Sequence, residues 1–270
     1  MNTKLLQGNC LDLLKDIPDK SVDFILTDPP YGISYCKWDS VIPLERMWVE
    51  LRRVIKDNGA IALFSSQPFT SALVMSNPKM FKYEWVWDKI TKGNFRNAKI
   101  QPLRRIEYIC MFYSKQPTYN PQGLVESCVD NGRPNHSLQV KGEHAYNPIK
   151  RAETLSLHTN YPDNILVFSN KNQGSVHPTQ KPVALLEYLI KTYTNAGETV
   201  LDFTMGSGST GVAAVNLNRS FLGIELEEKY YNIAVERIEI AKQSKKEIEQ
   251  DSIDSNQATQ LKPNDQTTLA

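Results

Sequence analysis

The stretch LDFTMGSGSTG, residues 201–211, decides the fold, because it links an apolar strand to a helix through a glycine-rich turn. Gly206, Gly208 and Gly211 have the GxGxxG spacing of a nucleotide-binding βαβ unit, whose glycines let a ligand approach the backbone. Glu225 ends the next apolar run, 19 positions after Gly206. An acid at that point accepts hydrogen bonds from ribose hydroxyls, so the stretch predicts a site for an adenosine-bearing cofactor.

Asp202 indicates which cofactor this is. A carboxylate just before the glycine turn would lie close to the pyrophosphate of a dinucleotide and repel it. S-adenosylmethionine instead carries a cationic sulfonium and an ammonium group, which an acid attracts. The alternative is that Asp202 only caps the helix or stabilises the loop. The stretch favours S-adenosylmethionine over a nicotinamide dinucleotide.

Outside this stretch, apolar runs alternate with segments of helical periodicity, which is the pattern of a mostly parallel sheet covered by helices. Strands are expected at residues 22–26, 60–64, 83–87, 106–113, 164–168, 199–203 and 221–226. Helices are expected at residues 44–55, after Pro182, at 206–218 and from about 228, with Asn58-Gly59 as the stop signal of the first. The fold class is therefore α/β.

Two segments differ from this pattern. Residues 116–163 are rich in Pro, Asn, Gly, Gln and Ser, which predicts an insertion or an irregular subdomain. Residues 243–270 are polar and poor in aromatic side chains, which predicts a frayed or disordered tail. A chain of 270 residues can hold one large α/β domain beside such an insertion.

The composition is that of a soluble globular protein, with 40% hydrophobic and 23% charged residues. No apolar run reaches the length of a membrane span, and the N-terminus lacks a signal-peptide core. The cysteines show no CxxC spacing, which argues against a zinc site or a disulfide framework and indicates a reducing, cytosolic setting. They are Cys10, Cys36, Cys110 and Cys128.

A basic segment extends from Lys89 to Lys115, with seven cations against the single acid Glu107, although the net charge of the chain is only +1. Such an excess marks a candidate phosphate-binding surface. A solvated, lysine-rich loop is the equally open alternative. If the segment binds DNA, the expected contacts are Lys92, Asn94, Arg96, Lys99, Arg104 and Arg105.

The second informative motif is Asp28-Pro29-Pro30-Tyr31, directly after the apolar run at residues 22–26. The two prolines stiffen the turn and leave carbonyl acceptors exposed. Asp28 adds a carboxylate and Tyr31 a flat ring, so together they suit a planar base with an exocyclic amine. The alternative, an ordinary proline-rich turn, does not account for the glycine stretch in the same chain.

These four residues also suit methyl transfer to the amine. Its lone pair is delocalised into the ring, so two acceptors on its hydrogens, Asp28 and the Pro29 carbonyl, would turn that lone pair toward the cofactor methyl. No enzyme nucleophile is required. Cys36, close to the motif, is interpreted as a structural thiol.

The proline motif precedes the glycine motif in this chain. In this order the chain resembles the DNA amino-methyltransferases of the β arrangement, in which the catalytic motif precedes the cofactor motif. Residues 28–31 match their catalytic tetrapeptide, and residues 202–210 match their DPFxGSGTT loop, with Phe-Thr in place of Pro-Phe. The segment 177–182, HPTQKP, matches the family's element beside the methionine end of the cofactor, although Thr179 could simply cap the helix after Pro182. Gly8-Asn9-Cys10 matches an element in which an acid accepts a hydrogen bond from the cofactor adenine. Asn9 replaces that acid here, and its amide oxygen can still accept.

The resemblance implies a Rossmann-like, seven-stranded methyltransferase sheet with circularly permuted motif order and a small target-recognition insertion. The catalytic domain would comprise residues 1–113 and 164–240, and the insertion residues 114–163. It also implies bacterial or phage origin, a cytoplasmic location and DNA as substrate. Homodimers are frequent in the family, and whether a partner restriction endonuclease exists stays open. The residues that it assigns to the cofactor are Asn9, Cys10, Asp28, Lys181, Asp202, Phe203, Thr204, Gly206, Ser207, Gly208, Thr210, Glu225 and Leu226.

The target base follows from the resemblance as well. Family members with Asp before the prolines mostly modify adenine N6, and those with Ser mostly modify cytosine N4, so adenine N6 is expected and cytosine N4 remains open. A nicotinamide dehydrogenase would give no role to residues 28–31. A DNA-binding regulator on an inactive methyltransferase fold is a third possibility, which the intact Asp28 disfavours.

Overall fold

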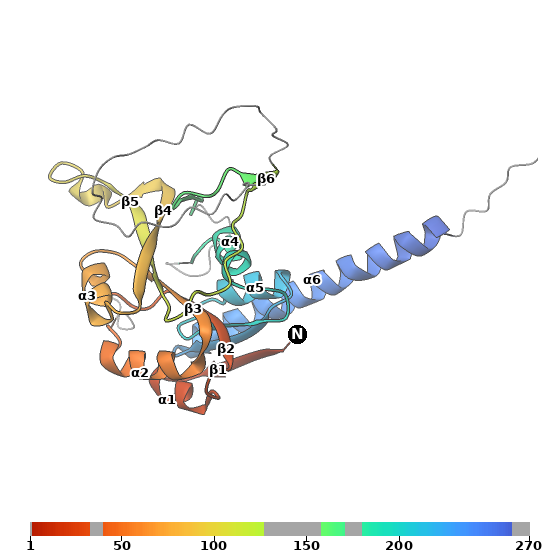
Figure 1. Ribbon diagram of the computed structural model, residues 1–270, viewed down its shortest axis with the longest axis horizontal. Coiled ribbons are helices and arrows are strands. Elements are labelled where there is room, and N and C mark those ends of the chain that lie inside the picture. The colour runs from red at the N-terminus through yellow and green to blue at the C-terminus, as the bar shows by residue number, and fades with distance from the viewer. Residues whose placement is uncertain (1, 33–39, 127–157, 171–179, 261–270) are drawn as a thin grey trace, which may run out of the picture. The chain divides into compact units, whose positions relative to one another are not determined.

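The computed structural model describes residues 2–32, 40–126, 158–170 and 180–260 (Figure 1). The chain divides into a larger unit, Met1–Asn120 with Asn164–Ala270, and a smaller one, Pro121–Asp163. The larger unit holds a sheet of eight described strands in the order β1-β10-β9-β2-β3-β5-β4-β8. These strands are β1 (Thr3–Gln7), β2 (Val22–Thr27), β3 (Ile55–Ser65), β4 (Phe81–Gly93), β5 (Arg104–Phe112), β8 (Ile165–Val167), β9 (Thr199–Asp202) and β10 (Ser220–Glu225).

Five neighbouring strands, β1, β10, β9, β2 and β3, are parallel, so their carboxyl ends share one edge of the sheet. The chain's first strand, β1, pairs with its last, β10, and β9 lies between β10 and β2. Motifs near the two ends of the sequence are thereby brought to one place. Ligands of open α/β sheets bind at such a carboxyl edge.

The strands β4 and β5 form an antiparallel hairpin beside β3. Because β5 runs against β3, its amino end reaches the same edge as the carboxyl ends of the parallel strands. The carboxyl half of β4 accompanies it, with Trp87 opposite Glu107. The basic segment is therefore not a free loop, because most of it belongs to this hairpin.

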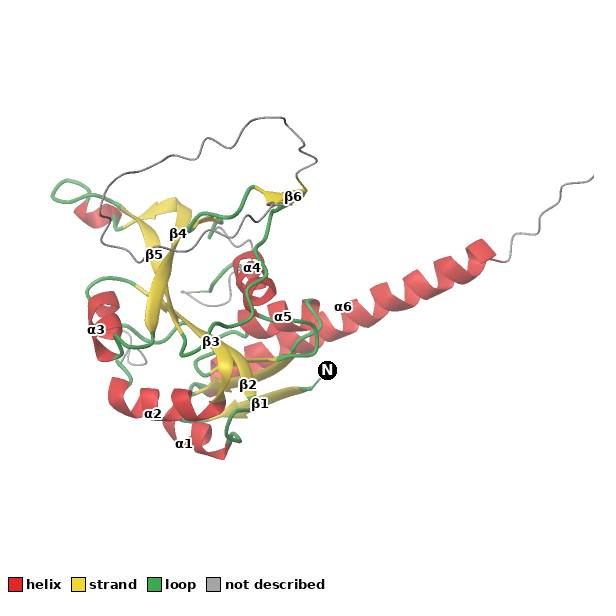
Figure 2. Ribbon diagram, viewed as in Figure 1, coloured by secondary structure: helices red, strands yellow, loops and turns green. Residues whose placement is uncertain are grey.

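Helices cover both faces of the sheet (Figure 2). One core packs beneath α1, α2 and α3, and the other beneath α4, α5 and α6. The helices are α1 (Cys10–Leu13), α2 (Leu44–Val54), α3 (Phe69–Ser76), α4 (Val183–Tyr193), α5 (Ser209–Asn216) and α6 (Glu228–Gln260), with 3-10 turns η1 (Leu14–Asp16) and η2 (Phe95–Asn97).

The helix α2 shows how the sequence produces this packing. Its apolar residues recur at helical spacing and are buried, while the opposite side carries charges. Trp48 is 2% exposed, and its indole N–H donates to Ser76 Oγ at 2.7 Å. Burial of a side chain of this size stabilises the fold by roughly 2–3 kcal/mol.

The expected helix stop at Asn58-Gly59 is wrong. The helix α2 ends at Val54, and β3 begins at once with Ile55, so both residues lie within that strand. A Cβ at Gly59 would lie 2.7 Å from the carbonyl oxygen of Asp23 on β2. The glycine therefore permits close approach of two strands rather than ending a helix.

The sheet has one described strand more than the seven expected. The additional strand is β1, which pairs in parallel with β10, whereas β8 lies within the strand expected at residues 164–168. The strand boundaries also differ, because β3, β4 and β5 extend beyond the apolar runs that predicted them. Backbone pairing continues past the buried part of each strand, where periodicity gives no signal.

The disordered tail expected from residue 243 is wrong as far as residue 260, because α6 continues to Gln260. Residues 243–250, QSKKEIEQ, are mostly strong helix formers, and just before them the side chains of Glu239 and Lys242 pair three residues apart at 3.3 Å. Lys245 also donates to the carbonyl oxygens of Val215 and Asn216 at the end of α5. Polar composition in this segment marks an exposed helix, not a disordered chain.

The smaller unit contains a two-stranded sheet, β6 (Val125–Glu126) with β7 (His158–Thr159). It starts at Pro121, later than the expected boundary at residue 114, because the preceding residues pack on α4. There the Asn120 amide donates to the carbonyl oxygens of Lys191 and Thr194. In the described part of the chain, no helix is long and apolar enough to cross a membrane.

Candidate active site

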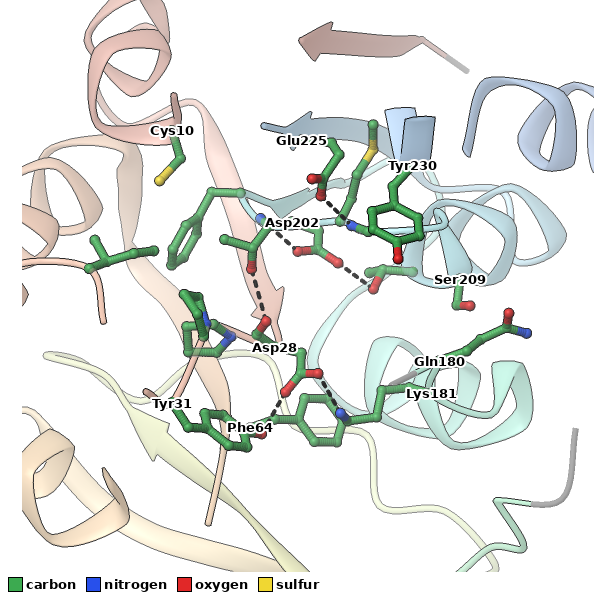
Figure 3. Close-up of a pocket in the computed structure, with 18 of the residues that line it drawn as sticks. Cys10, Asp28, Tyr31, Phe64, Gln180, Lys181, Asp202, Ser209, Glu225 and Tyr230 are labelled. Atoms are coloured by element: carbon green, nitrogen blue, oxygen red, sulfur yellow. Dashed lines mark hydrogen bonds and ion pairs between the residues drawn. The ribbon is translucent and has the colours of Figure 1, made fainter. Parts of the chain in front are cut away.

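A cavity of about 760 Å³ opens at the carboxyl edge of the sheet, within the larger unit (Figure 3). Its lining comes from the end of β1, the end of β2, the glycine turn between β9 and α5, the end of β10 and the β4–β5 hairpin. The segment that precedes α4 contributes Gln180 and Lys181 to the lining. The two motifs of the sequence, which begin at Asp28 and at Asp202, therefore share one cavity.

Asp28 is held from two sides, as Figure 3 shows. The Tyr31 hydroxyl donates to Oδ1 at 2.5 Å, and the Lys181 ammonium donates to Oδ2. Burial raises the pKa of Asp28 above its ordinary value, an effect that Lys181 opposes and the nearby Glu107 reinforces. The cation is thus what favours the ionised carboxylate at this position.

Lys181 lies in a cage of two aromatic rings and two acids. Its ammonium is 5.1 Å from the ring centre of Phe64 and 6.0 Å from that of Trp87. It lies 3.7 Å from Glu107 Oε2, and its side chain is only 10% exposed. Burial lowers the pKa of Lys181, but Asp28 and Glu107 outweigh that effect and raise it, so the lysine stays cationic.

Glu107 has two different carboxylate oxygens. Lys89 donates to Oε1 at 2.9 Å, whereas Oε2 is buried and accepts no hydrogen bond from a described residue. Burial raises the pKa of Glu107, but the two lysines outweigh it and leave the pKa below its ordinary value. Glu107 is therefore a buried anion that points one incompletely satisfied oxygen toward Lys181.

Asp202 is surrounded by neutral donors instead of cations. It accepts from the hydroxyls of Thr27 and Thr210, the latter at 2.6 Å, and from the Thr204 backbone N–H at 3.2 Å. Burial raises the pKa of Asp202 to about 6, although these donors act in the opposite direction. The loop-stabilising alternative is thus realised in the structure, and Asp202 also lines the cavity.

Glu225 ties the glycine turn to the neighbouring strands. Its carboxylate accepts from the backbone N–H groups of Gly206 at 2.8 Å and Glu227 at 2.9 Å. Its backbone oxygen accepts from Gly8 N at 2.8 Å, which fixes the residues after β1. Asn9 then caps α1, with Oδ1 accepting from Leu11 N at 2.9 Å.

The proline motif is joined to the glycine turn through Thr204, whose hydroxyl donates to the Asp28 carbonyl oxygen at 3.1 Å. The Tyr31 ring stacks on Phe69, with centroids 5.3 Å apart and planes at 23°. One face of Tyr31 is therefore covered by protein. Burial raises the pKa of Tyr31 well above its ordinary value, so its hydroxyl remains a donor to Asp28.

Most of the residues predicted for the site line the cavity, and Gly208 is the exception among the cofactor residues. Gly208 adopts φ +78°, and a Cβ there would lie 2.8 Å from the Ala234 Cβ, so its role is in the turn and its packing on α6. The predicted residues on the lining are Asn9, Cys10, Asp28, Pro29, Pro30, Tyr31, Arg104, Lys181, Asp202, Phe203, Thr204, Gly206, Ser207, Thr210, Glu225 and Leu226. Residues 177–179 and Cys36 lie outside the described residues.

The sequence argument missed Glu107, Phe64 and Trp87 as residues of the site. Glu107 had one available signal, as the single acid within the basic segment. Phe64 and Trp87 had none, because an aromatic residue in a strand is usually core. Lys181, whose segment was expected beside the methionine end of the cofactor, lines the cavity with its ammonium between Asp28 and Glu107.

The basic segment separates into paired and unpaired cations. Arg105 pairs with Asp88 through two hydrogen bonds of 2.6 Å, and Lys89 pairs with Glu107. Asn94, in a left-handed conformation with φ +68°, accepts from the Asn97 amide and shapes the turn. Four other cations have exposed side chains that form no ion pair with a described residue: Lys92, Arg96, Lys99 and Arg104.

Known proteins with this fold and these motifs are DNA methyltransferases. The family model described as DNA methylase matches residues 22–236, and the chain therefore belongs to the DNA methylase family. Members of this class transfer a methyl group from S-adenosylmethionine to DNA.

Two relatives illustrate the similarity in sequence. The type II methyltransferase M.HpaI of Haemophilus parainfluenzae is 29% identical over 259 residues, covering 88% of this chain and 75% of that protein. The DNA adenine methyltransferase YhdJ of Escherichia coli K12 is 29% identical over 256 residues, covering 88% of this chain and 83% of the relative.

Two solved structures share the fold. M1.HpyAVI in complex with S-adenosylmethionine matches with a TM-score of 0.61 and 24% identity, covering 87% of this chain and 98% of the other. The cytosine-N4-specific PvuII DNA methyltransferase matches with a TM-score of 0.63 and 16% identity, covering 88% and 86%. At these identities the likeness shows the fold.

The cavity also fits S-adenosylmethionine by its chemistry. Its glycine end presents the carboxylates of Asp202 and Glu225, which attract a cationic ligand and repel a pyrophosphate. The Gly206 N–H, which would bind a phosphate in a dinucleotide site, donates to Glu225. The residues present thus suit the sulfonium cofactor and disfavour a dinucleotide.

Proposed function

We propose that this protein methylates the N6 amine of adenine in DNA. The observation that carries the proposal is the position of Asp28, a half-buried carboxylate that lines the cavity and is joined to the cofactor turn through Thr204. An Asp before the two prolines, and a relative named as a DNA adenine methyltransferase, support adenine as the target.

Asp28 performs the central role in this proposal. With Oδ1 held by Tyr31 and Oδ2 by Lys181, its remaining lone pairs accept one hydrogen of the target amine. The Pro29 carbonyl accepts the other hydrogen, and the amine nitrogen turns its lone pair out of conjugation. The gain comes from orientation and from a preorganised negative charge beside an amine that becomes positive during transfer.

The cofactor supplies an electrophilic methyl group when it is bound. In our proposal, the acceptor positions that remain on Glu225 bind the ribose hydroxyls, and Asn9 accepts from the cofactor adenine amine. Asn9 Oδ1 also caps α1, so this contact uses its second lone pair. Phe203 and Leu226, both on the cavity lining, form the apolar surround of the adenine ring.

Adenine within a duplex must leave the stack to reach this cavity, at a cost of a few kcal/mol. We assign the opposing contacts to the hairpin that carries Lys92, Arg96, Lys99 and Arg104, where positive charge neutralises phosphates. We assign target recognition to the smaller unit, Pro121–Asp163, as a separate prediction. The homodimer and the bacterial cytoplasm stay predictions from the family resemblance, and whether a partner endonuclease exists stays open.

The test is incubation of the protein with unmethylated DNA and S-adenosylmethionine, followed by digestion to nucleosides and mass spectrometry. The expected product is N6-methyldeoxyadenosine, and Asp28→Asn protein is the matched control without it. N4-methyldeoxycytidine would keep the chemistry and replace the target base. The absence of any methylated nucleoside, on single- and double-stranded DNA alike, with the cofactor shown to bind, would contradict the proposal.

A further inference from the structure

Glu107 belongs to neither sequence motif, yet it lies at the centre of the charges around Asp28. It reaches the cavity because β5 is antiparallel to β3, which brings the amino half of β5 to the carboxyl edge. One of its oxygens accepts from Lys89, and the other is buried, accepts no hydrogen bond within the described part of the chain, and lies 3.7 Å from the Lys181 ammonium. A buried acceptor left incompletely satisfied is unfavourable for stability and calls for a functional explanation.

Lys181 is the link between the two acids. Among the described residues, its ammonium is the cation that pairs with both Asp28 and Glu107, and the rings of Phe64 and Trp87 lie beside it. Without that cation, two carboxylates would face each other in a largely buried place, where like charges repel strongly. The Lys181 ammonium is therefore held between the two carboxylates and reduces the repulsion between them.

We propose that Lys181 and Glu107 are positioning residues for methyl transfer: Glu107 holds the Lys181 ammonium against Asp28, and Lys181 keeps Asp28 ionised and oriented toward the target amine. The proposal rests on the proposed function of Asp28. It assigns Lys181 to the reacting base rather than to the carboxylate of the cofactor.

The groups that determine the charge of Asp28 come from several elements. They are Tyr31 in the same turn, Lys181 before α4, Glu107 on β5, Lys89 on β4 through Glu107, and Asp202 at the end of β9. Of these, only the lysines favour the ionised form through charge. Loss of Lys181 would therefore raise the pKa of Asp28, and loss of Glu107 in the same protein would remove part of that rise.

The experiment is the pH dependence of single-turnover methyl transfer at saturating S-adenosylmethionine, with cofactor affinity measured by calorimetry. For Lys181→Met we expect the acidic limb of the profile to move to higher pH by at least about one unit. The cofactor Kd should change by less than about threefold, because our proposal engages the Lys181 ammonium with Asp28 and Glu107. Lys181→Arg, which keeps the charge, should keep the limb near its wild-type position.

Glu107 is tested in the same profile. Glu107→Gln should lower kcat about tenfold with KM little changed, because Lys181 loses its second anchor. In the double variant Lys181→Met/Glu107→Gln, the acidic limb should return part of the way toward lower pH. A purely structural role for these residues would lower the rate equally at every pH, and that result would overturn the proposal. So would a loss of cofactor affinity in Lys181→Met as large as its loss of turnover.

A second measurement separates this inference from the proposed function. Carbon-13 NMR of labelled aspartate carboxyls, with Asp28 assigned through Asp28→Asn, reads the titration of Asp28 without turnover. A higher pKa of Asp28 in Lys181→Met supports the inference even where the reaction itself is different. An unchanged titration contradicts it while leaving the methyltransferase function intact. Full activity in Asp28→Asn would instead contradict the proposed function.

Discussion

Asp28 and Asp202 are two aspartates at the carboxyl ends of neighbouring strands, and the protein treats them differently. Asp202 is 3% exposed and is bound by two hydroxyls and a backbone N–H. Asp28 is bound by one hydroxyl and one ammonium, and its side chain is 22% exposed to the cavity. Burial raises the pKa of both carboxyls, but only at Asp28 does a cation oppose the effect.

The difference separates a structural acid from a reactive one. Neutral donors fix the position of Asp202 and so shape the cofactor turn, while its charge remains weakly supported. A cation preserves the charge of Asp28, on which attraction of a developing positive charge depends. The two halves of the cavity should therefore respond differently to substitution, with binding and stability affected in one half and the rate in the other.

Asp28→Asn tests the reactive half and should have the largest effect. The amide keeps the size and the Tyr31 contact but removes the charge, so we expect kcat to fall by at least about 10³-fold. The cofactor Kd should stay within about threefold of the wild type. Single-turnover kinetics with calorimetry of cofactor binding checks both, and a variant that loses affinity instead of rate would erase the distinction between the two acids.

Asp202→Ala tests the structural half. It leaves the Thr27 and Thr210 hydroxyls and the Thr204 N–H without their acceptor, which should lower the free energy of unfolding by roughly 3 kcal/mol. Weaker cofactor binding should accompany it, by about tenfold or more. Urea denaturation measures the first, and Thr210→Val, which removes one donor, should show about a third of the loss. Wild-type stability in Asp202→Ala would contradict the role.

The pH dependence of stability sharpens the contrast. The pKa of Asp202 is raised on folding, from an ordinary value of 3.8 to about 6. Its neutral form is therefore favoured in the folded protein, and this stability is fully present below pH 3.8 and is lost as pH rises through about 6. Relative to Asp202→Asn, the wild type should lose on the order of 3 kcal/mol across this window, as read from denaturation at several pH values. If the stability of the wild type relative to Asp202→Asn instead increased with pH, the pKa of Asp202 would be lowered on folding, and the assignment would be refuted.

The β4–β5 hairpin, to which our proposal assigns DNA binding, supplies a comparison between unpaired and paired cations. Replacing Lys92, Arg96 and Lys99 by alanine should weaken DNA binding by about 1–2 kcal/mol and flatten its salt dependence, for all sequences alike. Arg105→Ala is the matched control, because Arg105 is already paired with Asp88 and should have less effect. Fluorescence anisotropy at several salt concentrations measures both. Equal effects would show that the ion pair does not withhold Arg105 from DNA.

Asn9→Asp should have the smallest effect. An aspartate can still cap α1 through Leu11 N, so stability should change by less than about 0.5 kcal/mol. The added charge should tighten cofactor binding by about two- to fivefold through a stronger hydrogen bond to the adenine amine. Calorimetry checks the affinity, and weaker binding in this variant would place the adenine elsewhere.

The parts of the site that could be predicted from sequence are those in which a few adjacent residues form a turn with a distinctive geometry. Residues 28–31 and 202–210 are of this kind, and their sequence alone indicates the family. Glu107 could not be found in this way, because it enters the site only through the register of β4 with β5 and the reversed direction of β5. A local sequence pattern does not indicate which distant strands will pair or in which register.

The errors in the fold have a related origin. Asn58-Gly59 has the composition of a helix stop, but a side chain at Gly59 would clash with the backbone of β2, a strand more than 30 positions earlier in the chain. The segment after residue 243 has the polar composition of a solvated tail, yet α6 continues through it, and Lys245 donates to carbonyl oxygens at the end of α5. At Gly59 a tertiary contact decides the structure, and in α6 such a contact adds to local helix propensity.

The pairing of β1 with β10 has a consequence for the time at which the enzyme can appear. During synthesis, β1 and the turn with Asp28 leave the ribosome well before β9 and β10, the strands that pair with β2 and β1 in the sheet. Gly8 obtains its acceptor only when Glu225 has been made. A nascent chain therefore has no complete cofactor site until most of it is translated, and a ribosome that stalls midway releases a fragment with the reactive aspartate but no means to use it.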